Sequence, residues 1–169
     1  MTGRRISIDW RDIKVMHPES ISIGDRFSAG RGLWLESVAG KGKLTIGERV
    51  NVSDYVHIGC AMSVTIGNGV LIGSKVLITD HSHGETGSAG AEQIHVAPNL
   101  RPIVSKGPVT VSDNVWIGDG VCVLPNVTIG TGAIIGANAV VIRDIPPQTI
   151  WAGVPAKQVW PLPTKHLKA

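Results

Sequence analysis

The stretch "VTIGNGVLIGSKVLI", residues 64–78, repeats one pattern every six residues. Ile66, Ile72 and Ile78 mark the period, and glycine follows the first two. A period of six matches neither the 3.6 residues per turn of an α-helix nor the two-residue alternation of a strand. It is typical of a solenoid in which each hexad supplies one short strand and one corner.

The same phase extends over most of the chain. The other sets of repeated aliphatic residues are Ile46, Val52 and Ile58; Val111, Ile117 and Val123; Ile129, Ile135 and Val141; and a weaker first set, Ile23, Ala29 and Leu35. A second small or aliphatic residue follows four places later, as at Val70 and Ala133. Three hexads per turn, with the repeated residue pointing inward, account for this pattern. The alternative, a valine-rich β-sandwich with chance spacing, does not explain why one phase persists.

Composition and charge narrow the class of protein. The 169 residues are 43% hydrophobic with only 4% aromatic residues and 21 glycines, which predicts one all-β domain with tight corners. The formal charge of +3 comes from scattered basic residues, so no nucleic-acid partner is expected. Cys60 and Cys122 form no CxxC pair, which favours a reduced, cytoplasmic setting. The first residues lack the apolar stretch of a signal peptide, and no integral membrane segment is expected.

The repeat is interrupted twice. Ile58 and Ile66 are eight residues apart, which predicts two extra residues at a corner near Met62 and Ser63. Between Ile78 and Val111 the hexads vanish. A solenoid accommodates insertions as loops that leave a corner, because its strands must keep stacking. Residues 80–107 are therefore predicted to form an excursion from the β-helix.

The excursion carries the histidines His81, His83 and His95. A neutral imidazole is suited to general-base catalysis near neutral pH, so this segment is a candidate site of proton transfer. Asp80 either orients an imidazole or caps a turn. His95 lies in a segment expected to be mobile and is not expected to be catalytic. His57 falls at an outward hexad position, where a surface or subunit-contact role is expected.

The stretch "VTVSDNVWIGDGVCVLPNVTIGTGAIIGANAVVIRDIPPQTIWAGVPAKQV", residues 109–159, strongly resembles the hexapeptide-repeat acyltransferases. The likeness is to sugar O-acetyltransferases of the galactoside and maltose type and of surface-polysaccharide biosynthesis, and it covers roughly Ile21 to Trp160. It implies a left-handed parallel β-helix, a homotrimer and acetyl-CoA as acyl donor, with no metal. Residues 1–160 then form a single acyltransferase domain, and 161–169 a C-terminal tail.

The resemblance also implies roles for individual residues. Counted without gaps, the family's catalytic histidine falls on His83, while His81, two residues earlier, stays open as the base. Asn51 and Asp54 fall near the family's acceptor site. The positions implied for acetyl-CoA binding are Trp116, Gly118, Asp119, Ala137, Ile142, Arg143, Lys157 and Trp160. The last of these replaces a basic residue of the galactoside type.

The resemblance and these residues together predict an acetyl-CoA-dependent O-acetyltransferase. Its expected acceptor is a sugar hydroxyl in a precursor of a surface polysaccharide, namely lipopolysaccharide, capsule or exopolysaccharide. The long loop after Gly84 is similar to that of acetyltransferases in such pathways. Two alternatives stay open. His81-x-His83 also suits a zinc enzyme of the γ-class carbonic anhydrase type on the same β-helix, although a third ligand is not evident. A non-catalytic β-helix scaffold is the other, and it would bind neither acetyl-CoA nor CoA.

Overall fold

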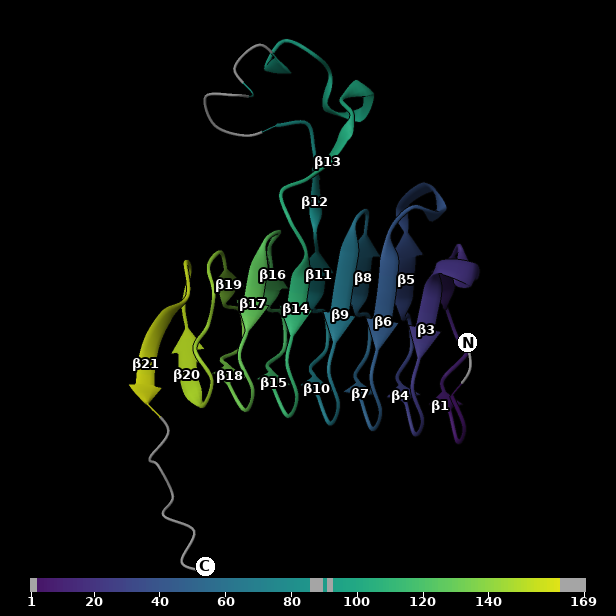
Figure 1. Ribbon diagram of the computed structural model, residues 1–169, viewed down its shortest axis with the longest axis vertical. Helices are drawn as coiled ribbons and strands as arrows, with labels where there is room; N and C mark the ends of the chain where they lie inside the picture. Colours follow the sequence, from purple (N-terminus) through teal and green to yellow (C-terminus); the bar gives the residue numbers. More distant parts are fainter. Residues whose placement is uncertain (1–2, 86–89, 91–92, 162–169) are drawn as a thin grey trace, which may run out of the picture.

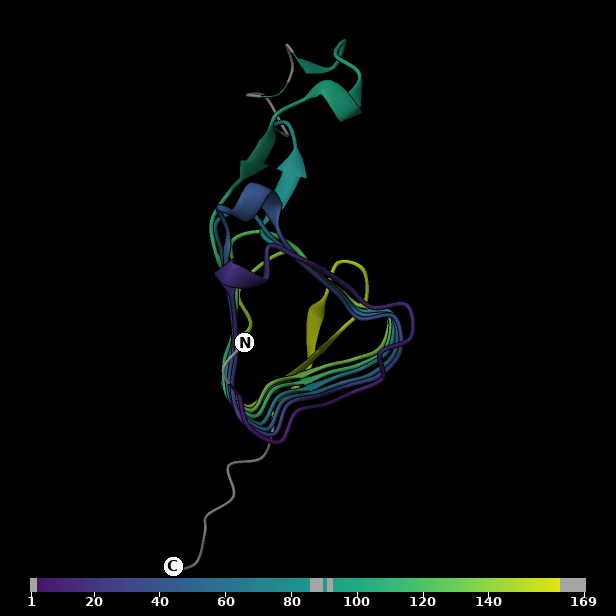
Figure 2. The ribbon, with the colours of Figure 1, turned by 90° about the vertical axis from the view of Figure 1, so that its right-hand side faces the viewer.

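The computed structural model describes residues 3–85, 90 and 93–161. They form a parallel β-helix with a triangular cross-section, from which one arm projects (Figures 1 and 2). The chain winds counterclockwise as it recedes from a viewer at the N-terminal end, so the β-helix is left-handed (Figure 2). The predicted fold class is confirmed. Of the predicted tail, residues 162–169 lie outside the described part.

Three parallel sheets form the sides of the prism, and successive strands visit them in the order C, A, B. Sheet A holds β1 (Ser7–Ile8), β4 (Ser28–Ala29), β7 (Asn51–Val52), β10 (Leu71–Ile72), β15 (Trp116–Ile117), β18 (Ile134–Ile135), β20 (Thr149–Ala152) and β21 (Lys157–Pro161). Sheet B holds β2 (Lys14–Met16), β5 (Trp34–Ser37), β8 (His57–Cys60), β11 (Leu77–Thr79), β16 (Cys122–Val123) and β19 (Val140–Val141). Sheet C holds β3 (Ile21–Ile23), β6 (Lys43–Ile46), β9 (Ser63–Ile66), β14 (Val109–Val111) and β17 (Val127–Ile129). Only β21 runs antiparallel to its neighbour, β20, among these pairs of described strands.

The corner between sheets B and C carries every longer connection. It holds the 3₁₀ turns η1 (Pro18–Ser20) and η2 (Val38–Gly40) in the first turns of the β-helix. After β11 the chain leaves through this corner as β12 (His81–His83) and returns as β13 (Ile103–Ser105), which pairs with β12 antiparallel. The turn η4 (Pro98–Leu100) lies between them. The predicted excursion over residues 80–107 is thus confirmed where it is described, and Figure 1 shows it standing off the prism.

The core is the line of repeated aliphatic residues. All those predicted to point inward are buried, and none is more than 8% exposed. The second residue of each hexad is buried as well, as at Val70 and Ala133. Apart from β21, the strands have only two to four residues and give each layer little area. Stability therefore comes from stacking one layer on the next, as in other solenoids.

Several corners are held by an Asp or Asn side chain that accepts a backbone N–H from the preceding turn. Asp54 Oδ1 accepts from Arg31 N at 2.9 Å, and Asp119 Oδ1 accepts from Ser74 N at 2.7 Å. Two predicted site residues thus have a structural bond of their own. In the described part of the chain, no helix is long and apolar enough to cross a membrane.

Candidate active site

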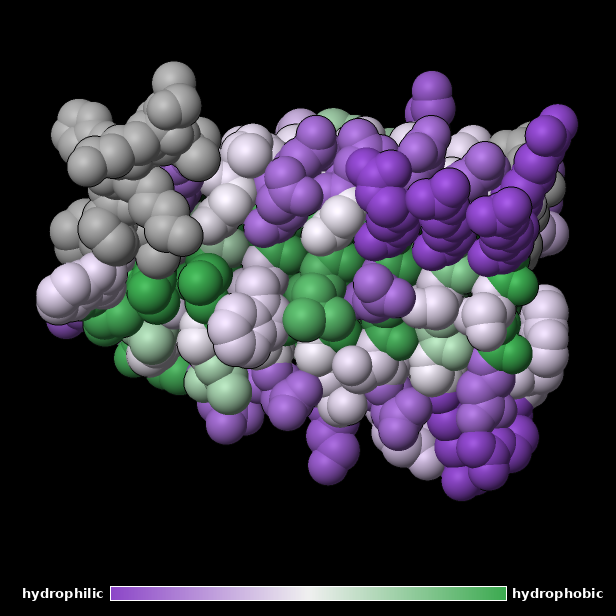
Figure 3. Space-filling view, turned by 90° about the horizontal axis from the view of Figure 1, so that it is seen from below, coloured by the Kyte–Doolittle hydropathy of each residue, from purple (hydrophilic) through white to green (hydrophobic). Residues whose placement is uncertain are grey.

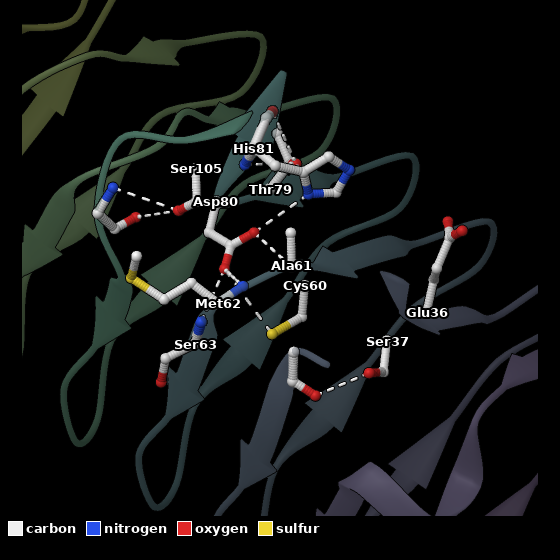
Figure 4. A network of polar contacts seen from close by, with 12 residues as sticks. Glu36, Ser37, Cys60, Ala61, Met62, Ser63, Thr79, Asp80, His81 and Ser105 are labelled. Carbon is white, nitrogen blue, oxygen red and sulfur yellow. Dashed lines mark hydrogen bonds and ion pairs between the residues drawn. The ribbon is translucent and has the colours of Figure 1, made fainter. Parts of the chain in front are cut away.

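Asp80 stands where the excursion leaves the β-helix, and its side chain is fully buried. Oδ1 accepts the backbone N–H of Ala61 at 2.7 Å, and Oδ2 accepts those of Met62 and Ser63 at 2.7 and 2.8 Å. These amides belong to the corner where the eight-residue spacing predicted two extra residues. Asp80 is therefore the cap of that corner, in line with one of its two expected roles (Figure 4).

The same carboxylate contacts an imidazole. Nδ1 of His81 lies 3.1 Å from Asp80 Oδ1 and 3.2 Å from the hydroxyl of Thr79. Burial alone would raise the pKa of Asp80, but the hydrogen bonds from His81 and the three backbone amides outweigh it and hold the pKa below its usual value. Asp80 is a carboxylate at neutral pH, so it favours the tautomer of His81 with the proton on Nδ1. The lone pair of that tautomer is on Nε2, which points away from the network in Figure 4.

A cavity of about 290 Å³ opens beside His81 at the corner between sheets B and C. Its lining is His81, Ser82, Lys106, Leu124, Pro125 and Ile142. Of these, the sequence predicted only His81 and Ile142 for the site. Leu124 and Ile142 each follow a strand of sheet B by one residue and lie one turn apart. The hexad phase alone would have shown that they occupy the same position in successive turns.

His83 lies farther out on the arm and is exposed. Its backbone pairs with Ile103, and its ring has no hydrogen-bond partner within residues 3–85, 90 and 93–161. His95 is also exposed. His81 is the histidine with both a buried carboxylate partner and a position at a cavity, whereas His83 has neither.

A second hollow, a groove of about 380 Å³, lies on the outer face of sheet A near its corner with sheet B. It brings together Trp116, Gly118, Asp119 and Ala137, four of the residues predicted to bind acetyl-CoA. The side chain of Trp116 is 52% exposed and stands in register between Leu71 and Ile134. Figure 3 looks onto this face and shows an apolar band toward the C-terminal turns.

The remaining predicted residues lie apart from both hollows. Arg143, Lys157 and Trp160 are exposed, the first just beyond β19 and the others on β21. Asn51 is on sheet A and accepts a hydrogen bond from Ser28 Oγ, and Asp54 caps the next corner. Within one chain, Asn51 and Asp54 are on a different corner of the prism from His81.

Sequence reasoning assigned no chemistry to Glu36 and His57, which lie on the outer face of sheet B. His57 Nε2 is 3.4 Å from Glu36 Oε2, and the ring of His57 stacks on Trp34 with 3.8 Å between centroids. Desolvation lowers the pKa of His57, although Glu36 acts in the opposite direction. In the described residues no group of three His, Cys, Asp or Glu side chains could hold a metal ion.

Comparison with known proteins places this arrangement in a family. Residues 108–143 match the model described as bacterial transferase hexapeptide (six repeats). The protein named "Putative lipopolysaccharide biosynthesis O-acetyl transferase WbbJ" of Escherichia coli (strain K12) is 45% identical over 82% of this chain and 70% of its own length. The chain belongs to the hexapeptide-repeat acetyltransferases. It is an enzyme of that family, as the resemblance implied.

A further relative and two solved structures are also similar to this chain. The galactoside O-acetyltransferase of E. coli (strain K12) is 36% identical over 84% of this chain, which spans 57% of that relative. Among solved structures, AntD, an N-acyltransferase from Bacillus cereus in complex with dTDP and 3-hydroxybutyryl-CoA, matches with a TM-score of 0.77 over 95% of this chain and 82% of its own, at 20% identity. An acetyltransferase from Vibrio cholerae, VCA0836, complexed with acetyl-CoA, matches with a TM-score of 0.57 over 94% and 72%, at 23% identity. At these identities the likeness concerns the fold.

Proposed function

We propose that this acetyltransferase moves an acetyl group from acetyl-CoA to a hydroxyl of a carbohydrate, in a precursor of a surface polysaccharide, with His81 as the general base. The observation that carries the proposal is the contact between Asp80 and His81 at the mouth of a cavity. A buried carboxylate on Nδ1 fixes the tautomer and the ring orientation that a base on Nε2 needs. His83, which the residue count preferred, has no such partner among the described residues.

The reaction needs no covalent enzyme intermediate. Nε2 of His81 takes the proton of the acceptor hydroxyl while its oxygen attacks the carbonyl carbon of the thioester. The tetrahedral intermediate then breaks the C–S bond, and the leaving thiolate of CoA takes the proton from the imidazolium. The ester is formed, CoA leaves as a thiol, and His81 returns to its neutral state. Asp80 stays ionised throughout and stabilises the imidazolium.

Acetyl-CoA as the donor is supported by the family and by the shape of the surface. VCA0836, similar in fold, was solved with acetyl-CoA, and AntD with another acyl-CoA. The apolar lining of Leu124, Pro125 and Ile142 suits the pantetheine arm beside His81. Arg143 and Lys157 are cations that can pair with the phosphates, and Trp160 offers an aromatic surface for the adenine. A CoA-dependent reaction of this kind belongs in the cytoplasm.

A homotrimer would complete the site. The groove on sheet A carries Trp116, Gly118, Asp119 and Ala137, but it opens at a different corner from the cavity of His81. In a trimer whose threefold axis is parallel to the axis of the β-helix, one corner of each protomer packs against a different corner of the next protomer, and the ring closes. Such packing would also cover the exposed side chains of Leu71 and Trp116. We infer that the donor lies between two protomers, in the cavity beside His81 of one and against the groove on sheet A of the next.

The carbohydrate acceptor is supported by the names of the relatives. WbbJ is named for lipopolysaccharide biosynthesis and the second relative for a galactoside. The deciding experiment is an acetyl-transfer assay with acetyl-CoA and a panel of methyl glycosides and nucleotide sugars, followed by mass spectrometry. A product heavier by one acetyl group supports the proposal. Turnover of acetyl-CoA onto amines alone would overturn it.

A further inference from the structure

The outer face of sheet B bears a polar surface on the N-terminal side of His81. Glu36 and His57 occupy outward positions on β5 and β8, and their side chains are 22% and 29% exposed. Trp34 fixes the ring of His57, because the two rings stack with 9° between their planes. Lys14 Nζ lies 3.9 Å from the centroid of the Trp34 ring. The side chains of this surface are held in place by ring stacking and by the strands that carry them.

Gly59 is the point on which this surface and the proposed base converge. It lies in register with Glu36 on one side and Thr79 on the other. A Cβ atom at Gly59 would be 3.1 Å from Cε1 of His81 and 3.5 Å from Nε2 of His57. The absence of a side chain therefore lets the imidazole of His81 lie close to the sheet, beside His57. In Figure 4 the ring nitrogen that does not face Asp80 points to the side on which Glu36 lies.

The two sides of His81 differ in chemistry. Toward the C-terminal turns the cavity is lined by Leu124, Pro125 and Ile142 together with Lys106. Toward the N-terminal turns the neighbours are Glu36 and His57. A thioester with its pantetheine arm is largely apolar, whereas a sugar ring carries a hydroxyl on nearly every carbon. The first side suits the donor and the second suits the acceptor.

We propose that Glu36, held in place by His57, forms an acceptor subsite that binds the hydroxyls next to the reacting one, on an uncharged sugar ring. The inference rests on the proposed function and assigns residues that it does not use. The Glu36 carboxylate can accept hydrogen bonds from two hydroxyls. His57 Nε2 is itself buried and faces Glu36 Oε2 at 3.4 Å, so His57 holds the carboxylate in place. Trp34 and Gly59 are positioning residues, because they act through His57 and His81.

The charge of this surface determines which sugar rings it excludes. Desolvation lowers the pKa of His57, which favours a neutral ring. Lys14 is separated from His57 by the ring of Trp34, so Glu36 is the charged side chain that faces His57. A carboxylate or phosphate on the reacting ring would face that charge and be rejected. The subsite therefore selects a neutral ring over a uronic acid, and any phosphate of a carrier must lie beyond it.

The test compares Glu36→Gln with wild type in acetyl transfer to methyl glucoside and to methyl glucuronide. If another sugar of the panel reacts best, its neutral form and its uronic acid are the matched pair. We expect Glu36→Gln to raise the KM for the neutral acceptor about tenfold, as for a lost hydrogen bond to a charged group, and to leave the KM for acetyl-CoA unchanged. We also expect the preference of wild type for the neutral sugar to shrink in the variant. Glu48→Gln, an exposed glutamate at another corner with a side chain that is 57% exposed, is the matched control and should behave as wild type.

The outcomes separate this inference from the proposed function. If Glu36→Gln transfers with unchanged KM and unchanged preference while His81→Ala is inactive, the acceptor subsite is wrong and the proposed function stands. If the KM for acetyl-CoA rises as much as that for the sugar, the surface does not distinguish the two substrates and the subsite is overturned. If wild type acetylates no carbohydrate of the panel, the proposed function fails and the subsite fails with it.

Discussion

Asp80 and His81 are adjacent in sequence, and their side chains meet with Oδ1 3.1 Å from Nδ1. The same carboxylate also accepts hydrogen bonds from three backbone amides of the preceding turn. One buried side chain therefore closes a corner of the β-helix and holds the imidazole that leaves it. The stability of this corner and the orientation of the proposed base are coupled through a single residue.

Asp80→Asn should weaken both. In wild type the backbone N–H donors face the two carboxylate oxygens, whereas the side-chain amide of Asn replaces one oxygen by an NH₂ group. At least one buried donor therefore loses its partner, which should lower the free energy of unfolding by about 1–3 kcal/mol. Turnover should fall as well, because the tautomer of His81 is no longer fixed. Thermal unfolding and acetyl-transfer rates measure the two effects. Asp113→Asn, at an exposed cap that accepts from Asn68 N at 2.7 Å, is the control and should change both much less. A variant with unchanged stability would show that the three amides do not depend on the carboxylate.

The lowered pKa of Asp80 also predicts an acid limit to stability. A carboxyl whose pKa is depressed in the folded state contributes stability above its unfolded pKa, for which the usual value is 3.8, and loses it as the pH falls through the lower folded value. The melting temperature of wild type should therefore drop below about pH 4. Asp80→Asn, which has no carboxyl to protonate at this position, should lose less stability than wild type over the same range. Parallel curves for the two proteins would assign the acid limit to other carboxyls.

The two cysteines should differ in reactivity. Cys60 is fully buried, and desolvation together with the nearby charge of Asp80 raises its pKa to about 12. Cys122 is partly exposed on the outer face of sheet B. Iodoacetamide at pH 8 should leave Cys60 unmodified in the native protein and modify it in urea, because the thiolate is the reactive form. Peptide mass spectrometry on wild type and Cys122→Ser distinguishes the sites. Rapid native labelling of Cys60 would mean that the corner capped by Asp80 opens readily.

The hexad period predicted the three sheets and the inward residues because each layer repeats the same local environment. Both breaks in the period also corresponded to real insertions. The period could not show which imidazole contacts Asp80. The gap-free count favoured His83, whereas in the structure the ring of His81 lies against Asp80 and beside Gly59. Glu36 and His57 are 21 residues apart, and their meeting depends on the register of β5 with β8. From the sequence, their outward hexad positions predicted only that they lie on the surface.

Arg143→Ala and Lys157→Ala should each raise the KM for acetyl-CoA and leave the KM for the acceptor nearly unchanged. Both side chains are exposed, so each contact with a phosphate should be worth roughly 1 kcal/mol, which is a change of about fivefold. Steady-state kinetics with each substrate varied in turn gives the two constants. Lys75→Ala, at a corner of an earlier turn, serves as a control for the loss of surface charge. Equal effects on both substrates would place these residues outside the donor site.

The assignment of the base can be tested by removing each histidine of β12 in turn. His81→Ala should fold, because the ring lies outside the stacked core, and should still bind CoA in calorimetry. Its kcat should fall by roughly 10²–10⁴, the usual contribution of a positioned base. His83→Ala removes an exposed ring that contacts no carboxylate in the described part of the chain, and it should keep most of the activity. If His83→Ala is the inactive variant, the base is the one that the residue count preferred, and the arm must bend to bring it to the thioester. If both variants turn over normally, the histidines only shape the arm, and the proton is taken by another group.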